Sequence, residues 1–140
     1  MDERIIHAKL ESLRLCLSRI RDKTPASVGI LSNDIDLQDI ISVNLERAVQ
    51  VCVDIAAHII SESDEGTPAS MGESFDSLHS LGIISQDLSL RMKKAVGFRN
   101  ISVHAYQAID WEIVYAIITT RLDDFTSFAT SVTDTLDESG

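Results

Sequence analysis

A sustained helical spacing of apolar residues is the feature that most restricts the fold of this chain. Towards the C-terminus, apolar side chains recur at intervals of three or four residues, at Trp111, Val114, Ile118, Leu122, Phe125, Ala129, Val132 and Leu136. An α-helix turns once every ~3.6 residues, so this spacing places all of them on one stripe. The sequence therefore predicts a long final helix with Asp110 as its N-cap and an apolar face turned to a core.

The same spacing predicts four more helices upstream. A connector, residues 24–34, separates the first two, because Pro25 disfavours helix at the residue before it and Gly29 adds turn character. Ser70 and Glu73 have the spacing of a capping box, which opens a helix. We expect these helices at residues 2–21, 36–61, 70–82 and 85–100, with Asp36, Ser70 and Ser85 as N-caps.

Length and composition favour a single helical domain. The chain has 140 residues, enough to bury a core, and only 5% of them are aromatic, a low share for a β-sandwich. We expect an all-α, up-and-down bundle of about five helices in one domain, residues 1–140, with a frayed tail at 136–140.

The composition also indicates the cellular compartment in which the protein acts. No apolar run approaches the ~18 residues of a membrane span, and the charged N-terminus is unlike a signal peptide. Cys16 and Cys52 each fall within an apolar stripe, so we interpret them as reduced, buried thiols. These features predict a cytoplasmic protein that does not contact a membrane.

Charge is distributed unevenly along the chain. The net charge is −10 at pH 7, which argues against a general nucleic-acid binder, because phosphate contacts dominate such binding. Residues 91–106 nevertheless carry four cations and no acidic residue. Of these cations, Arg91, Lys93 and Lys94 are candidates for binding RNA, and a solvated helix face is the alternative interpretation.

The sequence contains none of the common cofactor or metal motifs. It has no GxGxxG or Walker-type loop, and no paired-cysteine or HExxH spacing. Its histidines, His7, His58, His79 and His104, do not cluster as metal ligands would. We therefore expect neither a cofactor nor a metal site.

One short segment carries side chains suited to phosphodiester chemistry: Arg99, Asn100, His104 and Tyr106, in the pattern R-x4-H-x-Y. A histidine can accept the ribose 2′-hydroxyl proton or protonate the leaving oxygen, and an arginine fork can stabilise charge growing on a phosphate. A tyrosine hydroxyl can bind a phosphate or be modified. No metal is required. The spacing of Arg99 and His104 alone, however, is more typical of a surface arginine and a capping histidine at a helix junction than of a catalytic pair.

Arg99 and His104 cannot meet one small substrate from a single straight helix. Five residues at ~100° each separate their directions by about 140°. Two arrangements would bring them together: a break in the helix near Asn100, which the β-branched Ile101 and Val103 make plausible, or a cleft between two copies of the chain. The second arrangement predicts a homodimer.

Two acidic residues of the second predicted helix are candidates for a supporting role. Asp54 and His58 stand four residues apart, a spacing typical of a satisfied polar pair on one helix face. The functional alternative is that Asp54 or Glu46 orients Arg99 or His104.

The motif lies within a wider pattern. The string R-N-x-x-V-H-x-Y at 99–106 follows the run 92–98, and further matching stretches are 45–47, 54–59, 74–75 and 81–84. The combined pattern, over essentially residues 4–130, resembles the HepT family of the HEPN superfamily. This resemblance implies a homodimer whose two motif segments line a cleft and cleave RNA without a metal. It also implies a partner, a minimal nucleotidyltransferase (MNT) antitoxin that can transfer AMP to the motif tyrosine.

Applied residue by residue, the resemblance gives catalytic roles to Arg99 and His104, a supporting role to Asn100, and the role of AMP acceptor to Tyr106. The implied function is an endoribonuclease that acts as the toxin of a bacterial toxin–antitoxin system. The alternative is a non-catalytic helical partner that presents substrate to a nucleotidyltransferase, as related helical chains without the motif do.

Overall fold

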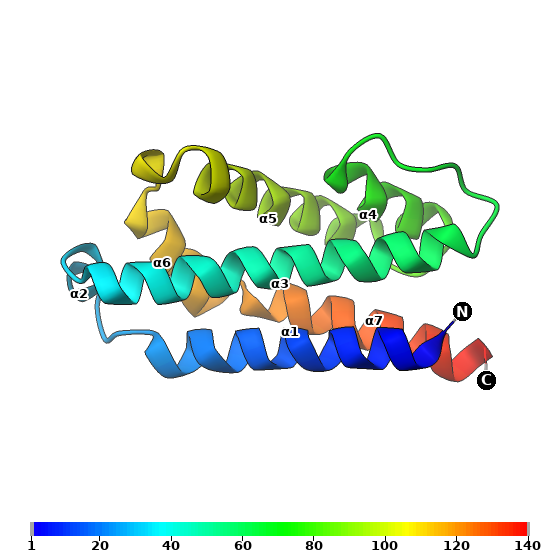
Figure 1. The fold of residues 1–140 in the computed structure, drawn as a ribbon, viewed down its shortest axis with the longest axis horizontal. Helices are drawn as coiled ribbons and strands as arrows, with labels where there is room; N and C mark the ends of the chain where they lie inside the picture. Colours follow the sequence, from blue (N-terminus) through cyan, green and yellow to red (C-terminus); the bar gives the residue numbers. More distant parts are fainter. Residues whose placement is uncertain (1, 140) are drawn as a thin grey trace.

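The computed structural model describes residues 2–139, and all regular structure in that range is helical, which confirms the predicted all-α class. Figure 1 shows an elongated bundle of long helices lying side by side. These are α1 (Glu3–Lys23), α3 (Ile35–Ser61), α5 (Gln86–His104) and α7 (Leu122–Ser139). Shorter elements join them: α2 (Val28–Ser32), α4 (Met71–Ser80), the 3-10 turn η1 (Tyr106–Ala108) and α6 (Trp111–Thr120).

Helix α3 occupies the centre of the bundle. It contacts α1, α2, α4, α5 and α7, and Figure 1 shows it running between α1 and α5. Ala48 and Ala56 are completely buried, and such small side chains let neighbouring helices approach α3 closely. Cys16 and Cys52 are free and buried, as expected, and burial raises the pKa of both thiols. A helix buried on so many sides must form from apolar residues over most of its circumference.

A second part of the core joins α4 to α7. Phe75 and Phe128 are fully buried and meet edge to face, with ring centroids 5.8 Å apart. Helix α4 begins at Ser70, whose hydroxyl accepts a hydrogen bond from the amide of Glu73, while the Glu73 carboxylate accepts one from the amide of Ala69. The predicted N-cap at Ser70 is therefore confirmed.

The predicted number of helices, about five, is too low. The expected connector contains α2, which starts at the N-cap Ser27 and is anchored by the fully buried Leu31. Helix α3 also begins earlier than expected, because Asp34 rather than Asp36 is its N-cap and accepts a hydrogen bond from the Leu37 amide.

The prediction of a single long final helix is also wrong, because a break at Arg121 divides this segment into α6 and α7. The hydroxyls of Thr119 and Thr120 donate to the carbonyls of Tyr115 and Ala116, one turn earlier. Such side-chain bonds to the i−4 carbonyl compete with the backbone ladder and bend helices. The apolar stripe continues across the break, so the periodicity alone does not show it. The expected frayed tail is helical as far as Ser139, and residue 140 lies outside the described range.

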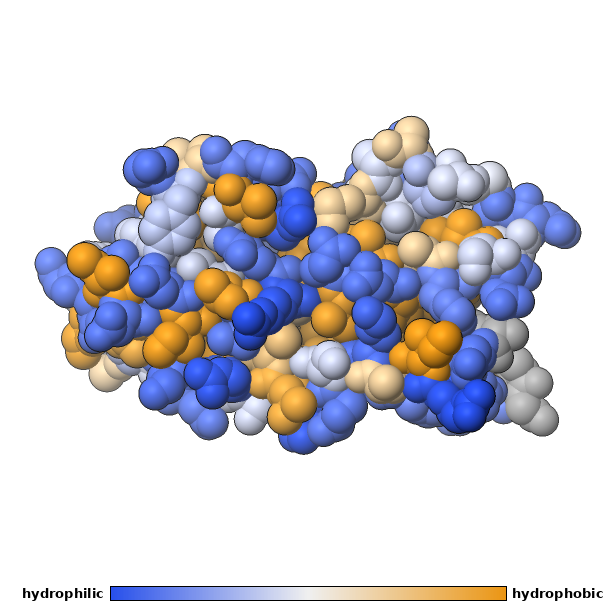
Figure 2. Space-filling view, viewed as in Figure 1, coloured by the Kyte–Doolittle hydropathy of each residue, from blue (hydrophilic) through white to orange (hydrophobic). Residues whose placement is uncertain are grey.

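Figure 2 shows the side on which α1 and α3 lie in front, where hydrophobic side chains occur in groups separated by hydrophilic ones. No helix within residues 2–139 is long and apolar enough to cross a membrane.

The turn after α4 gives a test of the fold. Gly82 has φ +77°, and its amide and that of Ile83 donate to the carbonyls of His79 and Leu78, which closes the helix with a Schellman motif. We expect Gly82→Ala to lower the free energy of unfolding by about 1–2 kcal/mol, because a Cβ is disfavoured at positive φ. Urea denaturation measures the change. Gly66→Ala, at a loop position with open space for a Cβ, is the control and should change stability much less.

Candidate functional site

Helix α5 continues without a break through His104 and ends at Ala105, whose φ of −146° is not helical. The possibility of a helix end near Asn100 is therefore wrong. Ser102 is buried and donates a hydrogen bond to the carboxylate of Glu46 on α3. This contact and the packing of α5 on α3 outweigh the weak helix propensity of the β-branched Ile101 and Val103.

Because the helix is continuous, one chain does not bring Arg99 and His104 together. Arg99 is partly buried on the side of α5 that faces α3, whereas His104 is exposed at the helix end. Of the two arrangements that the sequence left open, the structure removes the helix break. The remaining arrangement is a cleft between two copies of the chain.

A chain of hydrogen bonds fixes the guanidinium of Arg99. Its Nη2 donates to Oε1 of Gln50 at 3.4 Å, and its Nη1 donates to Oδ1 of Asn100 at 3.3 Å. Nε2 of Gln50 donates to Asp54 Oδ1 at 2.9 Å, and Lys9 Nζ donates to Asp54 Oδ2 at 3.2 Å. Since the Gln50 amide group donates to Asp54, its carbonyl oxygen must face Arg99, so the chain orients the guanidinium.

Gln50 was not identified from the sequence. The signal was available, since Glu46, Gln50 and Asp54 are spaced by four residues and share one face of α3. The expected Asp54–His58 pair does not form: Asp54 bonds to Gln50 and Lys9, and Nε2 of His58 is buried without a partner among the described residues. Hydrogen bonds therefore link Asp54 to Arg99 through Gln50, and Glu46 to Ser102 near the end of α5.

Tyr106 lies in η1, immediately after α5, and its side chain is 38% exposed. Its hydroxyl donates to Oδ1 of Asp39 on α3 at 2.8 Å, and its ring meets that of Trp111 edge to face at 6.0 Å. Partial burial raises the pKa of Tyr106, and the hydrogen bond to Asp39 raises it further. Asp39 was not identified from the sequence.

The three cations proposed to bind RNA differ in their surroundings. Arg91 forms ion pairs with Asp87 at 3.0 Å and Asp124 at 3.2 Å, and Lys93 pairs with Asp76 at 3.0 Å. Lys94 is exposed and pairs with no carboxylate among the described residues. The basic segment is thus partly neutralised by acids from other elements.

A groove of about 1010 Å³ lies between α5 and α6. Its lining includes Leu90 and Ile101 of α5 and Ile113 of α6, which are 51%, 46% and 57% exposed. Lys94 and Arg121 stand among the lining residues as well. The groove is an apolar surface that the single chain leaves uncovered.

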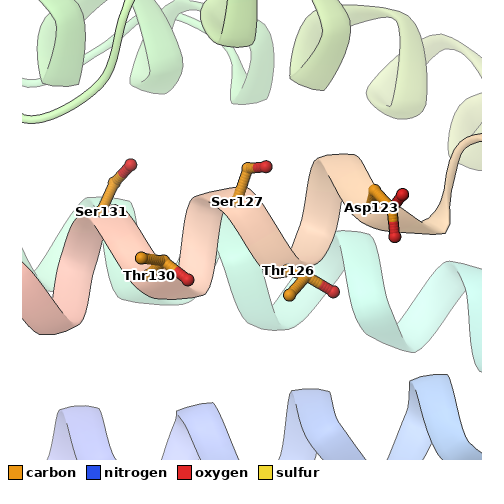
Figure 3. Close-up of a pocket in the computed structure, with 5 residues that line it drawn as sticks. All are labelled: Asp123, Thr126, Ser127, Thr130 and Ser131. Atoms are coloured by element: carbon orange, nitrogen blue, oxygen red, sulfur yellow. The ribbon is translucent and has the colours of Figure 1, made fainter.

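A shallower depression on α7 carries no comparable chemistry. Figure 3 shows that Ser127 and Ser131 point away from Thr126 and Thr130, so these hydroxyls do not converge. Within residues 2–139 no three metal-ligating side chains come together.

Comparisons with known proteins show the family of this chain. The family described as "Ribonuclease HepT-like" matches residues 10–132. The chain belongs to the HepT-like ribonuclease family. It is 37% identical to the mRNA nuclease HepT of Shewanella oneidensis, over 89% of this chain and 92% of that protein. It is 26% identical to the tRNA nuclease HepT of Aphanizomenon flos-aquae, over 86% and 82%.

This HepT-like chain also has the fold of a solved HEPN toxin structure. The solved structure is that of the tri-AMPylated Shewanella oneidensis HEPN toxin in complex with MNT antitoxin. The two folds superpose with a TM-score of 0.88 at 35% identity, covering 96% of this chain and 99% of the other. The resemblance to the HEPN superfamily that the sequence indicated is confirmed.

The contact between Tyr106 and Asp39 gives a direct test of the site geometry. Asp39→Asn should lower the pKa of Tyr106, because it removes a negative charge next to the phenol. Ultraviolet titration of the phenolate, with Tyr106→Phe to identify its contribution, measures the shift. Asp36→Asn removes an acid near the start of the same helix and should leave the titration unchanged, and an equal shift in both variants would contradict the assigned contact.

Proposed function

We propose that this chain is the toxin of a bacterial toxin–antitoxin system, an endoribonuclease that cleaves RNA without a metal in the cytoplasm. The observation that carries the proposal is the complete R-x4-H-x-Y motif, with Arg99 oriented by Gln50 and Asn100 and with His104 open to solvent. The relatives named as mRNA and tRNA nucleases support RNA as the substrate.

The chemistry assigns a task to each side chain. His104 accepts the proton of the ribose 2′-hydroxyl or protonates the leaving oxygen, and Arg99 stabilises the negative charge that grows on the phosphate. Asn100 holds the guanidinium from the same helix. General acid–base catalysis with an arginine needs no metal ion, and the product is a 2′,3′-cyclic phosphate.

A second copy of the chain completes the site in this proposal. The apolar groove between α5 and α6 provides the surface, since Leu90, Ile101 and Ile113 would leave water on association. His104 follows Ile101 by three residues and so lies at the edge of the same side of α5. A homodimer across this groove would bring His104 close to the interface, whereas Arg99 points toward Gln50 of α3 and does not line the groove, so it would be reached only if the interface extended past the groove toward the end of α5.

Binding of RNA involves the cations on α5. Lys94 pairs with no carboxylate among the described residues, but it lines the groove and so can contact RNA only from the edge of the proposed interface, whereas Arg91 and Lys93 must first release their ion pairs. Exposed pairs, such as those with Asp87 and Asp76, contribute about 0–1 kcal/mol, so a phosphate can displace them.

A partner protein would regulate the RNase activity in this proposal. We infer a cognate MNT-type nucleotidyltransferase antitoxin that transfers AMP to Tyr106, supported by the tri-AMPylated toxin in complex with its MNT antitoxin. The added phosphate would stand next to the motif and compete with RNA for Arg99 and Lys94.

Cleavage in EDTA tests the catalytic assignment. Purified wild-type protein should cut single-stranded RNA without added metal, and Arg99→Ala and His104→Ala should each lower the rate by roughly 10²-fold or more. Gln50→Leu should lower it less, by roughly tenfold, because it removes one hydrogen bond to a charged group. Cleavage is followed by gel electrophoresis, and phosphatase resistance of the new 3′ end identifies the cyclic phosphate.

Gln86→Leu is the control for this series, since Gln86 is exposed at the opposite end of α5. Its rate should equal that of wild type. Strict dependence on Mg²⁺ or Mn²⁺ would contradict metal-independent cleavage. A folded wild-type protein with no RNase activity would favour the alternative, a non-catalytic partner of a nucleotidyltransferase.

The dimer has its own test. Ile113→Glu should weaken association, because it puts a charge into the apolar groove, and the same variant should lose RNase activity. Analytical ultracentrifugation at micromolar concentration measures the mass. Leu15→Glu, at an equally exposed apolar position on α1, is the control. A monomeric wild-type protein, or an Ile113→Glu variant that dimerises normally, would rule out this interface.

A further inference from the structure

Asp39 lies outside the R-x4-H-x-Y motif, yet it contacts the motif tyrosine. It stands near the start of α3, 67 residues before Tyr106, and its Oδ1 accepts the hydrogen bond from the phenol at 2.8 Å. Both side chains are exposed, so a partner protein can reach the hydroxyl without unfolding the segment.

The segment around Tyr106 holds the phenol in a fixed place. Backbone bonds from Ala108 and Ile109 close η1 against Ala105 and Tyr106, and Ile109 is buried at the end of the turn. The Trp111 ring supports the tyrosine ring from α6. The hydrogen bond to Asp39 is therefore made by a positioned side chain, and the phenolic oxygen, which the Ser42 hydroxyl also approaches, keeps a lone pair for a further bond.

We propose that Asp39 is the general base that activates Tyr106 for AMP transfer, so that the toxin itself supplies this group to the antitoxin's reaction. The inference rests on the proposed function. The phenolic oxygen attacks the α-phosphorus of ATP bound to the nucleotidyltransferase. The new O–P bond forms as the bond from the α-phosphorus to the bridging oxygen breaks, and pyrophosphate leaves. The phenolic proton passes to the Asp39 carboxylate and then to water.

The raised pKa of Tyr106 shows why a base is needed. A phenol is already protonated at neutral pH, and partial burial with the nearby carboxylates of Asp39 and Glu46 raises the pKa of Tyr106 further, so little phenolate is present to attack by itself. A carboxylate already hydrogen-bonded to the hydroxyl can take the proton during the attack. The Asp39 carboxylate therefore lowers the amount of free phenolate, but it also allows the protonated phenol to react by taking its proton during the attack.

The test compares AMP transfer to wild-type, Asp39→Asn and Asp39→Glu toxins by the cognate nucleotidyltransferase with ATP and Mg²⁺, measured by intact mass. Asparagine can still accept the hydrogen bond but cannot take the proton, so kcat at neutral pH should fall roughly 10²-fold with the KM for toxin nearly unchanged. Asp39→Glu should recover part of the rate. Asp36→Asn, a matched loss of one acid on the same helix, should behave as wild type.

The pH profile separates a base from a docking contact. The ratio of the Asp39→Asn rate to the wild-type rate should rise about tenfold per pH unit below the Tyr106 pKa, because only the variant depends on phenolate. Using the ratio cancels the antitoxin's own titrations. A constant ratio, or a loss confined to KM, would overturn the assignment of Asp39.

Peptide mapping of the adduct distinguishes a failure of the role proposed for Asp39 from a failure of the proposed AMP transfer to Tyr106. Normal transfer to Tyr106 in the Asp39→Asn variant would overturn the role of Asp39 alone. Absence of any adduct on Tyr106 in the wild-type toxin would overturn both this role and the proposed regulation by AMP transfer.

Discussion

The hydrogen bond from the buried Ser102 hydroxyl to Glu46 joins the end of α5 to the middle of α3. Because α5 remains helical through this contact, Arg99 and His104 are fixed on one rigid element with directions about 140° apart. A more flexible segment could bring the two side chains to one phosphate within a single chain. The rigid helix keeps their directions apart, and this geometry is the reason for proposing that a second copy completes the site.

Helix α3 combines two roles that usually belong to different elements. Most of its circumference is buried and forms the core, while a row of polar residues, Asp39, Glu46, Gln50 and Asp54, follows a single face. Each of these residues contacts the motif region or the chain of hydrogen bonds that leads to Arg99. The same face thus supports the proposed cleavage, through Gln50 and Asp54, and the proposed modification, through Asp39. Rigid support from a central helix is what a positioned site needs.

The acidic character of the protein is compatible with the proposed binding of RNA. Asp87 and Asp76, which pair with Arg91 and Lys93, are exposed and can be exchanged for phosphate, whereas Asp124, the second partner of Arg91, is mostly buried. The other acidic residues, which give the chain a net charge of −10, would repel nucleic acid elsewhere on the surface. An acidic surface of this kind would confine RNA to the motif region, and it would not increase the affinity for RNA.

The sequence by itself determined the helical class, the N-caps at Ser70, Ser85 and Asp110, and the motif residues, because capping and helical period are local properties of the chain. It could not reveal the break at Arg121, where the apolar stripe continues unchanged, or the persistence of α5 beyond Asn100, which depends on α3. The spacing of Gln50 with Glu46 and Asp54 marks a polar face, but the sequence does not show that Gln50 binds Arg99, 49 residues away, or that Asp39 binds Tyr106, 67 residues away. Only the packing of α5 and η1 against α3 brings those partners together, and a contact between distant segments has no signature in the spacing of either one.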